Sequence, residues 1–182
     1  MIVKKYQLSV IVAKADELPF CEKGNKINAF ISARVFGSVL VTGAKSNPRG
    51  NYNMKLLFPV FYPILNDKIT MRVWHKNNYK ANIFIANIPE HPQAGDNFNI
   101  SKLLSQDGRM SARWINLYGT HPLERSPRTR GRKEGSQWLG RVLLAFNVVT
   151  NERPMLMSQQ CNALKEPKNG CFQIWIDLYY II

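Results

Sequence analysis

The sequence predicts an all-β fold, an antiparallel sandwich of eight strands with one short helix and a long basic loop before the last strand. Apolar and polar residues alternate with a period of two through most of the chain, which is typical of strands with one buried face. Turn-forming residues interrupt these runs about every ten residues, a spacing typical of antiparallel sandwiches. The chain has 182 residues, of which 45% are hydrophobic, and this is enough for one domain with a real core.

The first half of the chain predicts five of these strands. Gly37 and Ser38 predict a hairpin turn between the second strand and the third. Pro59 interrupts the fourth run, which indicates a strand edge or a bulge, because proline cannot donate a ladder hydrogen bond. The five predicted strands are residues 8–12, 29–36, 39–42, 54–62 and 68–74.

The second half predicts one helix and three more strands. Ile100, Leu103 and Leu104 recur at helical spacing within residues 98–106, and Asn97 or Asn99 can serve as the N-cap. The three strands are predicted at residues 83–88, 114–118 and 138–149, so the domain occupies residues 1–150.

The C-terminal part is predicted to lie outside this domain. Residues 151–170 are polar and contain two prolines, as in a linker. Residues 171–182 alternate again, and two interpretations remain open: an extra strand that completes the domain, or the first strand of a following module.

The charge of the chain favours anionic partners. Its 25 Lys and Arg against 12 Asp and Glu give a formal net charge of +13, which suits phospholipid headgroups, nucleic acid or an acidic protein surface, or serves solubility alone. The densest basic segment is a polybasic loop, interpreted either as an arm for phospholipid or an acidic partner, or as a solvated insertion. Its residues are Arg125, Arg128, Arg130, Arg132 and Lys133.

Several classes of function find no support in the residues. No apolar run approaches the ~20 residues of a membrane-spanning helix, and no zinc signature or RNP-like segment indicates nucleic acid. No acid–base pair or phosphate loop is visible, so we expect no enzyme and no cofactor. Three scattered cysteines predict reduced thiols and no metal site, and the three histidines are isolated. These residues are Cys21, Cys161, Cys171, His75, His91 and His121.

Several short motifs together carry a family resemblance. Residues 15–19 read A-D-E-L-P after the first strand, Asn28-Ala29-Phe30 stands where Asp-Pro-Tyr or Asp-Pro-Phe is usual, and residues 47–51 read N-P-R-G-N. The most specific match is W-I-N-L-Y-G at 114–119 followed by G-R-V-L-L at 140–144. The chain therefore resembles a C2 domain of the ferlins, eukaryotic proteins of vesicle fusion and membrane repair, and it looks most like their third C2 domain.

The resemblance implies a C2-type β-sandwich that docks on anionic phospholipid membranes in vesicle trafficking, exocytosis or fusion. It also implies a place at the cytoplasmic face of membranes, within a larger tail-anchored protein. Ca²⁺-binding C2 domains use about five carboxylates on two loops. Here the corresponding positions are degenerate, so we expect no metal and Ca²⁺-independent docking. These positions are Glu22, Asn28, His75 and Asn77.

The same two loops supply a candidate membrane-binding set of four lysines and two aromatic wedges. Each basic residue near an anionic leaflet contributes ~1 kcal/mol before screening. The first alternative is that these lysines are merely solvated. The second is an interaction or structural module without lipid binding, which meets other domains of the same protein or an acidic protein partner. The candidate set is Phe20, Lys23, Lys26, Lys76, Tyr79 and Lys80.

Overall fold

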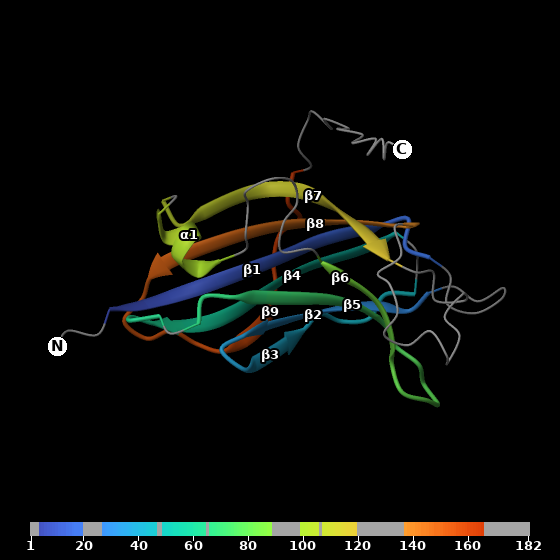
Figure 1. The fold of residues 1–182 in the computed structure, drawn as a ribbon, viewed down its shortest axis with the longest axis horizontal. Coiled ribbons are helices and arrows are strands. Elements are labelled where there is room, and N and C mark those ends of the chain that lie inside the picture. The colour runs from blue at the N-terminus through green and yellow to red at the C-terminus, as the bar shows by residue number, and fades with distance from the viewer. Residues whose placement is uncertain are drawn as a thin grey trace, which may run out of the picture.

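The computed structural model describes residues 4–19, 27–46, 49–64, 66–88, 99–105, 107–119 and 137–165. Two antiparallel sheets lie face to face, with one short helix beside them (Figure 1). This arrangement confirms the predicted all-β sandwich. No helix within the described ranges has the length and apolar character needed to cross a membrane.

All eight predicted strands are present, and a further strand follows them. The five-stranded sheet has the order β7-β8-β1-β4-β9, and the four-stranded sheet has the order β3-β2-β5-β6. The strands are β1 (Lys5–Asp16), β2 (Ala29–Val35), β3 (Ser38–Val41), β4 (Gly50–Phe61), β5 (Ile69–His75), β6 (Ile83–Ile88), β7 (Arg109–Gly119), β8 (Gln137–Thr150) and β9 (Met157–Gln160).

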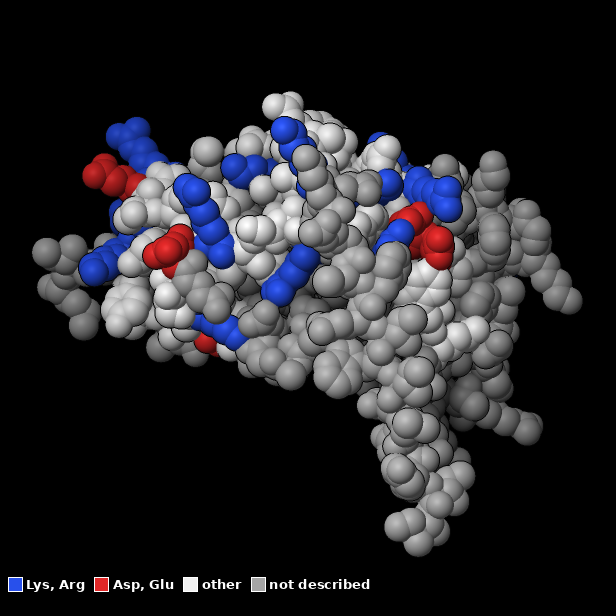
Figure 2. Space-filling model, turned by 90° about the horizontal axis from the view of Figure 1, so that it is seen from above, with Lys and Arg blue, Asp and Glu red and all other residues white. Residues whose placement is uncertain are grey.

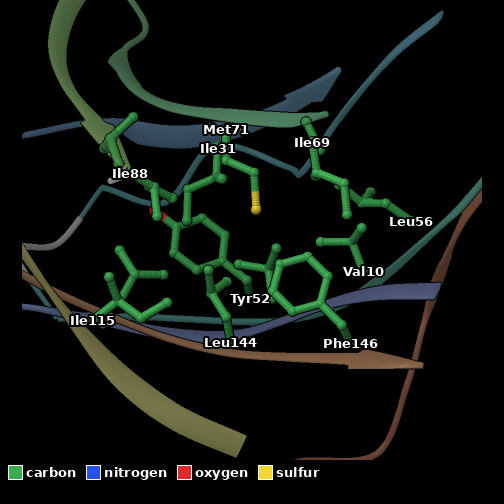
Figure 3. Packing of buried hydrophobic residues seen from close by; sticks show 14 of the residues in the cluster. Val10, Ile31, Tyr52, Leu56, Ile69, Met71, Ile88, Ile115, Leu144 and Phe146 are labelled. Carbon is green, nitrogen blue, oxygen red and sulfur yellow. The ribbon is translucent and has the colours of Figure 1, made fainter. Parts of the chain in front are cut away.

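The core lies between the two sheets, as the alternation predicts. In the five-stranded sheet, Val10 is paired with Leu56 on one side and with Phe146 on the other, and all three side chains are buried. In the four-stranded sheet, Ala33 is paired with Met71, and both face the core. Figure 3 shows Val10, Leu56 and Phe146 of one layer meeting Met71 of the other. Burial of this continuous apolar cluster holds the sandwich together.

One local feature differs from the sequence prediction, and another decides between two predicted alternatives. The β2–β3 turn is formed by Phe36 and Gly37, because Val35 is paired directly with Ser38. Both turn residues have positive φ, at 49° and 83°, as a type I′ hairpin turn requires. Pro59 causes no bulge, since it stays in register with β1. It does lie along an open strand edge, because the pairing of β4 with β9 ends at Leu57.

The predicted helix is present but shorter, as α1 (Ile100–Ser105). The Asn99 carbonyl accepts the Leu103 amide at 3.0 Å, which closes the first turn. The Gly108 amide then donates to the Leu103 carbonyl at 2.7 Å, and Gly108 has a φ of 70°. A glycine just past the last turn is a common helix stop. The helix therefore occupies the link between β6 and β7 and packs against β8.

The segment predicted as a linker contains a strand. Residues 157–160 form β9, which pairs with residues 54–57 of β4. On the way to β4 the chain crosses Gln7, a buried residue of β1. The Gln7 side chain donates to the Phe58 and Met155 carbonyls at 3.0 and 2.9 Å, and it accepts the Met155 amide at 2.7 Å. Residues 151–160 are thus fastened to the sandwich, while residues 171–182 lie outside the described part of the chain.

Candidate functional site

Four connections leave the sandwich at the same end, which we call the loop end. They join β1 to β2, β3 to β4, β5 to β6 and β7 to β8. The strand registers bring their bases together: Ala29 at the start of β2 is paired with His75 at the end of β5 and bridged to Lys45 before β4. The described residues of the candidate sites, namely Asn28, His75, Lys76, Asn77, Tyr79 and Lys80, all belong to this end.

His75 joins two of these connections at their base. Its side chain is 8% exposed, and its Nδ1 accepts the Asn28 backbone amide at 3.0 Å. The Lys76 amide donates to the Asn28 carbonyl at 2.7 Å, so the contact between the two segments is reciprocal. Because Nδ1 accepts this bond, the neutral ring carries its proton on Nε2. His75 therefore links the start of β2 to the end of β5 through this hydrogen bond.

Asn77 shapes the turn that follows. Its Oδ1 accepts the amides of Tyr79 at 2.9 Å and Lys80 at 3.1 Å, as an Asx turn does. The Asn77 amide in turn donates to Asn82 Oδ1 at 3.3 Å. This network holds Tyr79 outward with 95% of its surface exposed, between the exposed lysines Lys76 and Lys80. The turn thus presents one amphipathic ring between two cations.

The oxygens at the degenerate Ca²⁺ positions already have protein donors. Asn28 Oδ1 accepts the Ser46 hydroxyl at 3.3 Å, and Asn77 Oδ1 accepts two backbone amides. Ca²⁺ requires six to eight oxygen ligands, several of them charged. Within the described ranges, no group of three or more His, Cys, Asp or Glu could hold a metal ion. Glu22, the remaining position, lies outside those ranges.

The other predicted site residues also fall outside the described ranges. They are Phe20, Lys23 and Lys26 on the first loop, and Arg125, Arg128, Arg130, Arg132 and Lys133 of the polybasic loop. Their part in any site stays a prediction. Among the predicted cysteines, the described residue Cys161 is a free thiol. Burial raises the pKa of that thiol, and the nearby Lys55 charge partly opposes this rise.

A charged cluster at the end of β1 is absent from the sequence prediction. Asp16 is buried, and its Oδ2 accepts Arg141 Nη2 at 2.9 Å, while its Oδ1 lies 3.0 Å from Arg49 Nε. The Arg141 guanidinium lies 4.5 Å from the centre of the Trp114 ring, and Lys14 Nζ lies 5.9 Å from it. Asp16 and Arg141 are 125 positions apart, so no local pattern can indicate the pair.

Basic side chains outnumber acidic ones on the described surface on the side of β7. Figure 2 shows the molecule from this side, where Lys and Arg are spread over the described surface and Asp and Glu are fewer. Asp16 and Glu17 both lie within ion-pair distance of Arg49, at 3.0 and 3.9 Å. At the loop end, the charge of Arg49 is therefore partly balanced by these two carboxylates, whereas Lys76 and Lys80 are exposed.

Comparison with known proteins gives a consistent result. No model of a known protein family matches the chain. The chain is 38% identical over 174 residues to Ferlin 2 of Tetrahymena thermophila and 29% identical over 145 residues to Ferlin 2 of Toxoplasma gondii. These alignments cover 90% and 76% of this chain. The chain spans only about a tenth of the curated relatives it matches, 10% and 9% of their lengths.

Solved structures show the same fold at low identity. A structure of the two C2 domains of extended synaptotagmin 2 matches with a TM-score of 0.55 and 13% identity, covering 81% of this chain and 42% of that one. Human GIVD cytosolic phospholipase A2 matches with a TM-score of 0.52 and 9% identity, covering 83% of this chain and 18% of that enzyme.

A third match isolates the fold more sharply. A single C2 domain of plant extended synaptotagmin 1 has a TM-score of 0.50 and 10% identity, and the match covers 81% of this chain and 96% of that domain. The sandwich topology and this coverage identify a C2 fold. Together with the alignments, they show that the chain has a C2-type β-sandwich fold and is homologous to part of the two Ferlin 2 proteins.

Proposed function

We propose that the chain is a Ca²⁺-independent C2 module of a ferlin-like protein, which docks on anionic phospholipid membranes through its loop end. The observation that carries the proposal is the turn at Lys76–Lys80. It holds Tyr79 fully outward between two exposed lysines, and residues 76–82 contain no carboxylate. The proposal is for a binding module without catalysis.

The chemistry of the turn suits a lipid headgroup layer. A tyrosine ring is amphipathic and is enriched at membrane–water interfaces, where its body is apolar and its hydroxyl is hydrated. Lys76 and Lys80 each add ~1 kcal/mol near an anionic leaflet before screening. The net charge of +13 attracts the protein to such a surface and accelerates its approach. Phe20, Lys23 and Lys26 are proposed to extend the same contact.

Independence from Ca²⁺ is supported by the state of the amide oxygens. Asn28 and Asn77 use their side-chain carbonyls to hold the loop end together, and each is a neutral ligand. A dication would have to displace those bonds next to Lys76, whose charge repels it. Docking driven by permanent charges needs no metal, and it weakens as salt rises.

The test compares two matched double variants in vesicle co-sedimentation. Lys76→Ala/Lys80→Ala removes two charges at the loop end. Lys4→Ala/Lys5→Ala removes two exposed lysines at the start of β1, at the opposite end of the sandwich. The loop-end variant is expected to bind phosphatidylserine vesicles about 30-fold more weakly, since two contacts of ~1 kcal/mol are lost. The control is expected to lose less than about threefold. Equal losses in both variants would show that the loop end is not the docking site.

The alternative function is an interaction module without lipid binding, which meets other domains of the same protein or an acidic partner. An absence of vesicle binding by the unchanged protein at low salt would favour it. Location at the cytoplasmic face of a membrane, within a longer anchored chain, is part of the proposal and rests on the ferlin homology.

A further inference from the structure

A groove crosses the outer face of the four-stranded sheet, on the side turned away from the core. It has a volume of about 310 Å³ and runs over β3, β2 and β5. The strand registers place Phe30 opposite Trp74, Ser32 opposite Arg72, and Arg34 opposite Thr70. This surface is separate from the turn at Lys76–Lys80, although Asn82 at the base of that turn also lines the groove.

One part of the groove is cationic. Arg34 and Arg72 are both exposed, and neither side chain makes an ion pair or a hydrogen bond to another described residue. They are diagonal neighbours on β2 and β5, a relation that separates them by roughly 7–8 Å. No acidic residue is among the described residues that line the groove. Two arginines therefore occupy neighbouring positions on this face, and no carboxylate among the described lining residues balances their charge.

Another part of the groove is apolar, formed by two valines and an aromatic cluster. Val39 and Val41 of β3 are 46% and 47% exposed, although both are β-branched apolar residues. Trp74 stacks on Phe30 at 6.5 Å and meets the edge of Phe84 at 5.5 Å, and its Nε1 donates to Ser32 Oγ at 2.9 Å. The aromatic floor is thus held in one orientation before any partner arrives.

The geometry points to a binding site for an extended acidic peptide segment of a protein partner. In an extended chain, every second side chain lies on the same face, about 6.4–6.8 Å apart. Two carboxylates at positions i and i+2 therefore match the separation of Arg34 and Arg72. Arginine suits carboxylates because its planar fork can donate two parallel hydrogen bonds.

The apolar part of the groove distinguishes this occupant from an anionic headgroup. A headgroup can engage the two arginines, but it is polar throughout and leaves Val39 and Val41 in water. A peptide with apolar residues beyond its carboxylates covers the valines while it pairs with the arginines. Removing apolar surface from water adds to its affinity.

The experiment measures fluorescence anisotropy with a labelled eight-residue peptide. Its odd positions are Leu, Leu, Glu and Glu, and its even positions are Ser; a second peptide has Gln in place of Glu. The protein variants are Arg34→Ala/Arg72→Ala and a control of equal charge, Arg109→Ala/Arg153→Ala. Both control arginines are exposed and lie outside the groove. Val39→Ser/Val41→Ser tests the apolar part.

We expect measurable binding of the Glu peptide, about tenfold weaker in Arg34→Ala/Arg72→Ala and unchanged in the control. We also expect weaker binding of the Gln peptide and of the valine variant. Equal losses in the two arginine variants would reveal nonspecific charge attraction and overturn the inference. Absence of binding by the Glu peptide would also overturn the inference. This includes the outcome in which Arg34 and Arg72 are needed only for binding to vesicles that contain phosphoinositide. Vesicle binding through Lys76 and Lys80 is measured separately, so the two proposals fail independently.

Discussion

The Asp16 cluster allows a quantitative test of how the loop end is held in place. Asp16 ends β1, Arg141 lies at the start of β8, and Arg49 precedes β4, so one carboxylate links three segments. The Asp16 side chain is 9% exposed, against 25% for Arg141 and 69% for Arg49. The two arginines are therefore expected to contribute very differently, despite their similar distances.

The expected magnitudes follow from these contacts. The bond from Arg141 to Asp16 at 2.9 Å is charge-assisted and largely shielded from solvent, and such bonds contribute about 1.5–3 kcal/mol. Arg49 lies 3.0 Å from Oδ1 at ion-pair distance, but Oδ1 accepts no hydrogen bond from the described residues, and Arg49 is mostly solvated. An exposed pair of this kind contributes less than about 1 kcal/mol. Substitution of Arg141 by alanine also removes its cation–π contact with Trp114, which contributes about 0.5–1 kcal/mol.

The assay is urea unfolding of a double-mutant cycle at neutral pH. Asp16→Ala is expected to lower the free energy of unfolding by about 3 kcal/mol, Arg141→Ala by a similar amount, and Arg49→Ala by less than about 1 kcal/mol. The coupling energy between Asp16 and Arg141 is expected to be about 2 kcal/mol. A coupling below about 0.5 kcal/mol, or an equal cost for Arg49→Ala and Arg141→Ala, would refute the reasoning from burial.

Three other changes test separate parts of the fold. Gly140→Ala is expected to lower the free energy of unfolding in urea by about 3 kcal/mol, because φ is 100° and a Cβ there would lie 2.6 Å from the Asp16 carbonyl oxygen. The control Gly43→Ala, where a Cβ meets nothing within 4 Å, should lower it by less than about 0.5 kcal/mol. Gln7→Leu removes three hydrogen bonds and is expected to lower the free energy of unfolding by about 2–4 kcal/mol. It should also speed hydrogen exchange of the Met155 amide, and unchanged exchange would show that Gln7 does not hold residues 151–156 against β1. Tyr52→Phe removes the hydroxyl that donates to the Ala29 carbonyl at 2.9 Å, and burial raises the pKa of that hydroxyl far above its ordinary value of 10.0. Below about pH 10 the variant should be about 1 kcal/mol less stable. Above about pH 10 only the unfolded wild type releases this proton, so the wild type loses about 1.4 kcal/mol of stability per pH unit from this group. The stability difference should therefore shrink and change sign by about pH 11, and a constant difference up to about pH 11.5 would contradict the raised pKa.

The sandwich could be predicted from the sequence because apolar residues occupy every second position of most strands, and these residues form the inner faces. Val10, Ala33 and Met71 all face the core as their period-two patterns indicate. β9 has no such pattern, since M-S-Q-Q carries a single apolar residue. It forms because β4 offers an open edge, and because Gln7 holds the preceding segment across the sheet. Both conditions depend on residues about 100 or more positions away, which local periodicity cannot register.

The candidate sites divide in the same way. Family motifs placed Asn28, His75 and Asn77 at the loop end, and the structure brings Asn28 and His75 into direct contact there. The motifs did not indicate that these side chains form hydrogen bonds within the loop end. The groove was missed for another reason. Alternation places Arg34 and Arg72 on outward faces, but it does not show that β2 and β5 are neighbours and that the two arginines stand together.

The most direct test of the central claim is co-sedimentation of the chain with phosphatidylserine vesicles, in Ca²⁺ or in chelator, at low and high salt. We expect equal binding in Ca²⁺ and in chelator, no binding to neutral phosphatidylcholine vesicles, and marked weakening as salt rises, because exposed lysines carry the attraction. Binding that appears only with Ca²⁺ would contradict the structural role given to Asn28 and Asn77. Absence of binding to anionic vesicles at low salt would contradict membrane docking itself.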